Sequence, residues 1–368
     1  MTAANVSSDM NKRVLITGAA GCVGCQLITE LLEAGFHVVA VDRPGVPLPE
    51  PRPGMLDVIE IDLTNDRMAL ETARGVDVVV NLAAIVNISL PFKALAPINL
   101  NAVRHLYQGA VEGGASLFIH FSTGSLYQAA DYPIREDHPL QALNDYARTK
   151  LLSEDFLLTR NPTNGPAVNI IRPALIFGPR GKVLISSVAT TAALLRRYTG
   201  RMVRLRGGTR TNFVHSLDMA RAVRFLIEHP QPHAEVCNVA NDDARPVGEQ
   251  LSIMLEIAGM NLTGWSVPLP MTLLRWLRPA VDHDVVFRII NRRLSAMWER
   301  IQKENELSPD GVKPQLDRES LDYITGDFVF DNSKLKKLGF EYIYGDLESG
   351  WRHTLEWYRD NRWIPSID

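Results

Sequence analysis

The sequence predicts an α/β fold, in which a doubly wound parallel sheet is joined to a smaller, mostly helical C-terminal lobe. Short runs rich in Val and Ile alternate with helical stretches through the first half of the 368 residues. That alternation is typical of a parallel sheet covered by helices on both faces. The runs are apolar almost throughout, as expected of strands buried on both sides. After residue 180 the alternation loosens, which indicates a second lobe.

Six strands and four helices are expected in the first half. The strands span Arg13–Thr17, His37–Val41, Leu56–Ile61, Val76–Asn81, Leu117–Phe121 and Val168–Ile171. The helices lie near 24–34, 66–74, 94–112 and 145–160. Gly35 and the pair Gly113 and Gly114 stand where helix C-caps are expected.

The second half is predicted to be mainly helical. We expect a helix near 183–199, a basic strand near 202–207, and a turn and helix over 213–229. Residues 262–304 are apolar and rich in Arg, and we expect them to be helical. The first domain is placed at 11–180, with a segment near 210–240 returning to it, and the lobe at 181–368.

Composition and charge exclude several functional classes. The chain has 39 Lys and Arg against 42 Asp and Glu, so it carries no general electrostatic signal for nucleic acid. Its three cysteines cannot build a disulfide framework. The first ten residues lack the basic start and apolar run of a signal peptide, and no apolar run is long enough to span a bilayer. We expect a cytoplasmic protein.

A glycine-rich turn, TGAAGCVG at 17–24, follows the first strand and begins a helix. Gly18 permits the tight turn, Gly21 lets the backbone approach a pyrophosphate, and Gly24 allows close packing of helix and strand. The helix N-terminus then offers free N–H groups to the phosphates. The pattern predicts dinucleotide binding.

Asp42 closes the second strand, eighteen positions after Gly24. A carboxylate there accepts hydrogen bonds from the ribose hydroxyls and repels a 2′-phosphate, which favours NAD over NADP. Arg43 leaves some tolerance of NADP open. Cys22 and Cys25 form a C-x-x-C within the same turn, but no second pair exists to complete a zinc site, and we predict no metal.

Tyr146 and Lys150 stand four residues apart, on one face of a predicted helix. A free tyrosine has a pKa near ~10, and a neighbouring ammonium stabilises the phenolate and lowers that pKa. Ser122 and Thr123 follow the fifth strand, where side chains of a parallel sheet point into the ligand crevice. These residues predict proton transfer beside a bound dinucleotide.

Residues 13–230 resemble the extended short-chain dehydrogenase/reductase family, also called the NAD-dependent epimerase/dehydratase family. The resemblance rests on motifs that occur in family order: TGAAGCVG, Asp42, IDLTN (61–65), NLAA (81–84), INLNAVRHL (98–106), FSTGSLY (121–127), YARTK (146–150), IIRPALIFGPRG (170–181) and FVHSLDMARA (213–222). It implies a Rossmann-type NAD-binding domain. We also expect a homodimer.

The resemblance also implies residue roles. Tyr146 is expected to be the acid/base, Lys150 the modifier of its pKa, and Thr123 the catalytic hydroxyl. The implied contacts with NAD are Gly18, Gly21, Cys22, Val23, Gly24, Asp42, Arg43, Asp62, Leu63, Leu82, Ala83, Ala84, Asn99, Ser122, Tyr146, Lys150, Pro173 and Ile176.

Departures from the family pattern narrow the chemistry. Gly124 and Ser125 replace the Asp-Glu pair of the sugar dehydratases. Leu175 stands where sugar-nucleotide epimerases carry an Asn, and Thr211 where they carry an Arg. These changes look more like the 3β-hydroxysteroid dehydrogenase branch, and Ser125 and Leu175 are then expected to face the substrate. Alternatively, Leu175 only packs the end of its strand.

We therefore expect an NAD-dependent oxidoreductase that interconverts a secondary alcohol and a ketone on an apolar substrate. Sterol-like, 3-hydroxyacyl and polyketide-type substrates fit this description. An NAD-dependent sugar-nucleotide epimerase and a non-catalytic NAD sensor are the alternatives.

The segment 269–303 places several arginines among Leu, Trp, Val, Phe and Ile. One interpretation is an amphipathic helix that contacts a membrane peripherally. The other is a pair of lid helices with solvated Arg faces.

Overall fold

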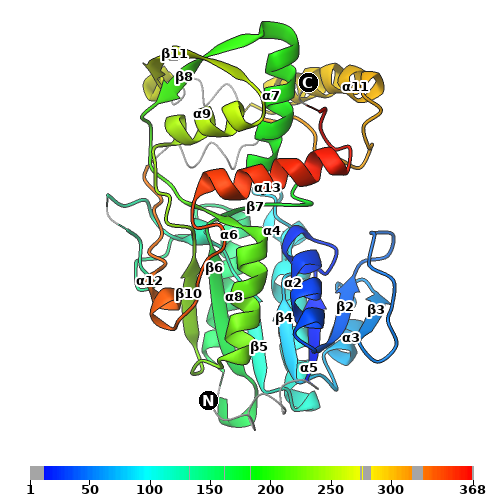
Figure 1. Ribbon diagram of the computed structural model, residues 1–368. Coiled ribbons are helices and arrows are strands. Elements are labelled where there is room, and N and C mark those ends of the chain that lie inside the picture. The colour runs from blue at the N-terminus through cyan, green and yellow to red at the C-terminus, as the bar shows by residue number, and fades with distance from the viewer. Residues whose placement is uncertain are drawn as a thin grey trace.

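The computed structural model describes residues 12–131, 133–160, 162–182, 184–273, 276, 283–316 and 326–366. Within these residues the central element is a seven-stranded parallel sheet of order β3-β2-β1-β4-β5-β6-β10 (Figure 1). Its strands are β1 (Arg13–Thr17), β2 (His37–Asp42), β3 (Leu56–Glu60), β4 (Val78–Asn81), β5 (Leu117–Phe121), β6 (Ala167–Pro173) and β10 (Glu235–Val239). The predicted doubly wound fold is confirmed.

Helices cover both faces of this sheet. On one face, α2 (Cys22–Glu33) and α8 (Ser216–Glu228) share an apolar core with alternate strand residues such as Val14 and Ile119. On the other, α3 (Asp66–Thr72), α5 (Val103–Gly113) and α6 (Asp145–Leu158) pack against the intervening residues, such as Leu15. Burial on both faces explains why the strands read as nearly continuous apolar runs.

The helix predicted over 94–112 is divided into three parts. It consists of α4 (Phe92–Ala96), a π-helix (Pro97–Ala102) and α5. Pro97 has no amide hydrogen, so the α-helical hydrogen-bond ladder is interrupted where the π-helix begins. The wider turn carries Asn99, whose contacts are described below.

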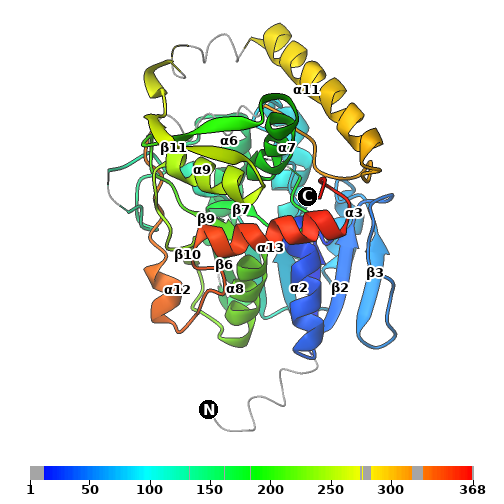
Figure 2. The same ribbon diagram turned by 45° about the horizontal axis from the view of Figure 1, so that its top comes forward.

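A second lobe has its own apolar core above the carboxyl edge of the sheet. Its elements are the strand pair β7 (Leu175–Phe177) and β9 (Phe213–His215), the strand pair β8 (Arg201–Arg206) and β11 (Asn261–Pro268), and the helices α7 (Ser187–Thr199), α9 (Val247–Ile257), α11 (Asp284–Glu304) and α13 (Leu347–Asp360). Helix α13 lies between the α2–α8 layer and α9 in both views (Figures 1 and 2).

The prediction that 262–304 is wholly helical is wrong for its first residues. Residues 261–268 form β11, which pairs in parallel with β8. Thr263, Trp265 and Val267 favour extended backbone, and the free edge of β8 supplies the partner. Part of the predicted Arg-rich segment 269–303, residues 274, 275 and 277–282, lies outside the described residues.

The chain returns to the sheet domain before α13. Phe330, Leu335 and Phe340, around the short helix α12 (Ser333–Lys337), pack in the same core as α2 and α8. Among the described residues, no helix has the length and apolarity needed to cross a membrane.

Candidate functional site

The predicted site residues follow the carboxyl ends of the strands. Since all seven strands are parallel, these ends meet along one edge, where open α/β sheets bind ligands. The turns after β1, β4 and β5 carry the glycines, the 82–84 loop and the Ser122–Thr123 pair.

The turn after β1 has no room for a side chain at Gly18 or at Gly24. Gly18 has a φ of +70°, and a Cβ added to it would lie 2.9 Å from the Ala83 nitrogen. A Cβ on Gly24 would lie 2.4 Å from the Gly18 oxygen. Gly21 is the N-cap of α2 and provides no side-chain cap, so the first-turn N–H groups remain available to an anion. This geometry fits a pyrophosphate.

Asp42 ends β2 beside this turn. One carboxylate oxygen accepts a hydrogen bond from the Ala20 N–H at 2.9 Å, and the other accepts from the Arg43 N–H at 2.8 Å. Each oxygen keeps a lone pair for a further donor. The carboxylate therefore holds the glycine-rich turn and can also accept from ribose hydroxyls. Together with the turn, it forms a set of residues that fits NAD.

The side chains of Cys22 and Val23 make their contacts within the protein. Val23 packs in the core beneath α2. The Cys22 thiol donates to the Pro179 carbonyl at 3.1 Å, and burial raises its pKa to about 12. Their contribution to cofactor binding would thus come from backbone N–H groups.

The loop after β4 is held by hydrogen bonds to Thr17 of β1 and to Asn99 of the π-helix. Leu82 N–H donates to the Thr17 carbonyl at 3.2 Å, and Ala83 N–H donates to the Thr17 hydroxyl at 3.3 Å. The Asn99 amide accepts from the Ile85 N–H at 2.8 Å and donates both to the Ile85 carbonyl and to the Thr149 hydroxyl. Asn99 is fully buried, so it positions the loop against α6 and offers no surface of its own.

Helix α6 brings Tyr146 and Lys150 to one buried face. Asn144 caps the helix by accepting from the Ala147 N–H at 2.8 Å. Tyr146 is 4% exposed and Lys150 is 2% exposed. Burial lowers the pKa of Lys150 to about 8, and the Glu154 carboxylate one turn further on opposes that shift.

The hydroxyl residues after β5 form a local network. The Thr123 hydroxyl caps a short 3₁₀-helix (Gly124–Leu126) by accepting from the Ser125 N–H at 3.1 Å. It also lies 2.7 Å from the Ser125 hydroxyl. The hydroxyl of Ser122 is buried and has no hydrogen-bond partner among the described residues. Thr123 and Ser125 are only half-buried, which leaves them accessible to a ligand.

The remaining predicted residues divide by exposure. Asp62 is exposed and accepts from the Thr64 N–H at 2.9 Å, whereas Leu63 is buried in the sheet core. Pro173 and Ile176 are half-buried at the end of β6 and in β7. Leu175 is 9% exposed and packs in the core of the second lobe.

Sequence reasoning missed a buried ion pair beneath α6. The Arg172 guanidinium donates to both oxygens of Glu154, at 3.0 and 2.5 Å, and to the Tyr127 hydroxyl at 2.8 Å. Glu154 lies eight residues after Tyr146 on the same helix face, and this spacing was the available signal. The pair keeps a carboxylate one turn from Lys150.

Sequence reasoning also missed a row of hydrogen-bonded side chains that links the three strands β1, β4 and β5. The Thr17 hydroxyl donates to the Asn81 amide oxygen at 2.6 Å, and the Asn81 amide lies 3.0 Å from Nδ1 of His120. Burial, and then the charge of Lys150, lower the pKa of His120 well below its usual value. His120 is therefore a neutral part of the wall behind Lys150.

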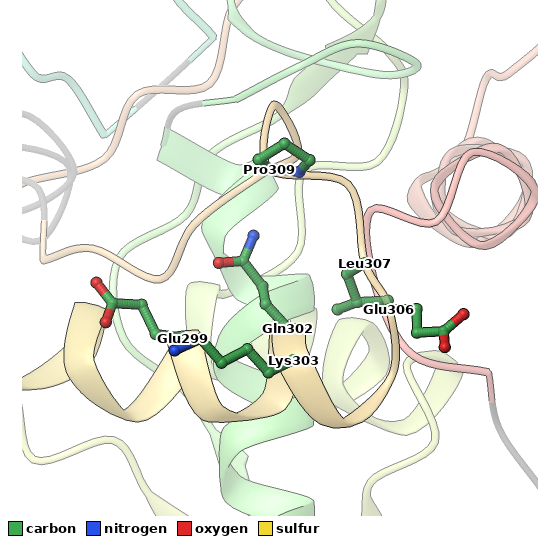
Figure 3. Close-up of a pocket in the computed structure, with 6 residues that line it drawn as sticks. All are labelled: Glu299, Gln302, Lys303, Glu306, Leu307 and Pro309. Atoms are coloured by element: carbon green, nitrogen blue, oxygen red, sulfur yellow. The ribbon is translucent and has the colours of Figure 1, made fainter.

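A surface hollow lies elsewhere, at the C-terminal end of α11 and the turn after it (Figure 3). Its lining is mostly charged or polar and contains none of the predicted site residues: Glu299, Gln302, Lys303, Glu306, Leu307 and Pro309. We do not assign the site to it, because neither the glycine-rich turn nor the Tyr146 and Lys150 pair lines it.

Comparison with known proteins matches residues 14–240 to the model of the NAD dependent epimerase/dehydratase family. A 3-beta-hydroxysteroid dehydrogenase of Mycolicibacterium neoaurum is 28% identical over 187 residues, which cover 48% of this chain and 50% of that protein. The chain thus matches about half the length of that relative. The uncharacterised UDP-glucose epimerase YtcB of Bacillus subtilis is 25% identical over 269 residues, covering 68% of this chain and 84% of that protein.

The solved structure of the Bordetella bronchiseptica enzyme WbmH in complex with NAD+ superposes with a TM-score of 0.68. It covers 95% of this chain and 99% of the WbmH chain at 18% identity. At this identity the likeness shows a shared fold.

Proposed function

The chain belongs to the NAD-dependent epimerase/dehydratase family, and from this premise we propose that it is an NAD-dependent oxidoreductase acting on an apolar secondary alcohol or ketone. The substrate class rests on two positions where the sugar-nucleotide epimerases carry polar ligands. Leu175 is apolar and nearly buried. Thr211 is 1% exposed, and its hydroxyl donates to the Phe328 carbonyl at 3.0 Å.

Neither position can donate to a diphosphate, whose binding needs charge-assisted hydrogen bonds. Arg210 lies one position away from the place where the epimerases carry an Arg. It is exposed, and its Nε already donates to the Ala244 carbonyl at 2.9 Å. A largely carbon substrate avoids the cost of burying an unpaired phosphate.

NAD, when bound, supplies the hydride chemistry. In our proposal Thr123 and Tyr146 hold the substrate oxygen, and Tyr146 transfers the proton. With a pKa of about 8, Lys150 is mostly an ammonium at neutral pH and stabilises the Tyr146 phenolate. Asn99 keeps the 82–85 loop against α6, and Ser125 faces the substrate beside Thr123.

A sugar-nucleotide epimerase is the second candidate, because the match to YtcB covers 84% of that protein, against 50% for the steroid dehydrogenase. An epimerase would use the same Tyr146 and Lys150. It would have to hold its diphosphate through residues other than 175 and 211.

Thermal shifts measured in the presence of NAD test the substrate class, because a ligand that binds the folded state raises its stability. We expect sterol-like, 3-hydroxyacyl or polyketide-type alcohols to raise the melting temperature above that with NAD alone, and UDP- or GDP-sugars not to. Leu175→Asn should reduce the shift with apolar ligands. A shift confined to sugar nucleotides would contradict the proposal. The predicted homodimer is tested by the mass measured in light scattering.

A further inference from the structure

Large apolar side chains are exposed mainly at the outer end of the second lobe. Trp265 is 83% exposed and Trp276 is 76% exposed. We call the following set the outer face: Tyr198, Val203, Trp265, Val267, Leu273, Trp276, Val285, Val286 and Ile289. Its members come from α7, β8, β11, the segment after β11, and the first turns of α11, which lie at the end away from β3 and α3 (Figures 1 and 2).

The strand pair β8–β11 contributes a two-sided surface. Met202 pairs with Leu262, and both pack against the lobe core. Side chains alternate along a strand, so Val203, Trp265 and Val267 point to the opposite side. That side is apolar and is not covered by any described element.

Helix α11 shows the same division along its length. Trp298 and Ile301, in its second half, are its buried residues. In the first half, Val285 is 48% exposed and Ile289 is 50% exposed. The exposed apolar surface therefore differs from the amphipathic segment predicted at 269–303. It includes residues of β8 and β11, and it does not include the second half of α11.

Arginines accompany these apolar residues without acidic partners. Arg201, Arg288, Arg292 and Arg293 are exposed, and none of them forms an ion pair within the described part of the chain. By contrast, Arg204 points to the inner side of β8 and pairs with Glu256 of α9. The outer face is thus both apolar and basic, although the whole chain has a net charge of −3.

We propose that the outer face docks on an anionic lipid bilayer. Exposed Trp and aliphatic side chains insert at the boundary between headgroups and acyl chains, and nearby arginines bind the anionic headgroups. A second copy of this chain fits less well, because a two-fold contact would set the unpaired arginines against one another. The docking is separate from the proposed function, since the outer face contains none of the predicted site residues.

Co-sedimentation of the full chain with vesicles tests the proposal. We expect binding to vesicles of phosphatidylcholine with 30% phosphatidylglycerol, weakened by salt, and little binding to phosphatidylcholine alone. Arg292→Glu with Arg293→Glu should weaken binding by at least about tenfold, since each basic residue near the membrane surface raises the affinity for anionic vesicles roughly fivefold. Trp265→Ser with Ile289→Ser should also reduce it by at least about tenfold.

A control is Leu338→Ser with Ile343→Ser, which removes two exposed apolar side chains, 41% and 48% exposed, from the sheet domain. It should bind vesicles as the wild type does, and circular dichroism should show that every variant is folded. Equal binding to neutral vesicles, no binding to anionic ones, or unchanged binding by both outer-face variants would overturn the proposal. The proposal would also be overturned if the wild type were a dimer that does not bind vesicles and the Trp265→Ser, Ile289→Ser variant were a monomer.

Discussion

The layer between α6 and the sheet and the outer face of the second lobe use similar residues in opposite ways. Arg172 is 4% exposed, and its donors are used by Glu154, Tyr127 and a backbone carbonyl. Arg292 is exposed without an ion pair in the described chain. The first region satisfies its polar groups internally and so holds Tyr146 and Lys150 in one geometry. The second leaves charge and apolar area for contact with something else.

The largest expected difference is between substitutions of two tryptophans of the second lobe, one buried and one exposed. Trp298 is 1% exposed and lies in the lobe core, whereas Trp265 is 83% exposed. We expect Trp298→Ala to lower the free energy of unfolding by about 3–5 kcal/mol and Trp265→Ala to change it by less than about 0.5 kcal/mol. Urea denaturation measures both, and equal losses would show that Trp265 is a structural residue.

Tyr146→Phe probes the α6 layer. It removes the proton-transferring hydroxyl and keeps the ring, so turnover should fall by about 10²-fold or more while NAD still binds. Turnover is followed with a substrate found in the thermal-shift panel, and NAD binding by calorimetry. Activity within a few-fold of wild type would remove Tyr146 from the mechanism.

Lys150→Met should separate activity from stability. The pKa of Lys150 is about 8 in the folded protein, against 10.5 when unperturbed, so at pH 7 the folded state carries a buried ammonium. The unfolded chain binds more protons between these two pKa values, so this group makes the wild type more stable as pH rises from 8 to 10.5.

At pH 7 the substitution should raise the free energy of unfolding by roughly 2–3 kcal/mol, less any packing mismatch, while turnover falls. Denaturation at pH 7 and pH 10 measures both effects, and the gain should shrink at pH 10. A variant less stable than wild type at pH 7 would indicate that Lys150 has stabilising partners.

The smallest expected effect concerns the choice of cofactor. Asp42→Ser should narrow the preference for NAD over NADP by about tenfold, because the carboxylate no longer repels a 2′-phosphate. Asp42→Asn is the matched control. It also removes the charge, but its amide oxygen can still accept from the Ala20 N–H and hold the glycine-rich turn, so it separates lost repulsion from a loosened turn. The ratio of kcat/KM for the two cofactors gives the answer. A wild type that prefers NADP would assign the dominant contact to Arg43.

The elements that sequence reasoning placed well are those with a local signal. β1 and β5 begin and end at the predicted residues, because each is a short run of apolar residues buried on both faces. The helix predicted near 145–160 is α6, and the four-residue spacing of Tyr146 and Lys150 placed both on one face of it. β11 was missed because its extended form depends on the edge of β8, sixty residues earlier in the chain.

The buried pair of Arg172 and Glu154 was missed for a similar reason. Its partners lie on β6 and α6, and only the packing of helix on sheet brings them together. Whether a predicted polar residue faces a ligand or the protein is also decided by tertiary contacts, as the saturated amide of Asn99 shows.

The absorbance of reduced nicotinamide tests the central claim most directly. The purified chain is mixed with NAD and either apolar secondary alcohols or UDP- and GDP-sugars, and the sugars are also analysed for epimerisation. We predict net formation of NADH with an apolar alcohol and no epimerised sugar nucleotide. Efficient epimerisation without NADH accumulation would contradict the account and assign the site to an epimerase.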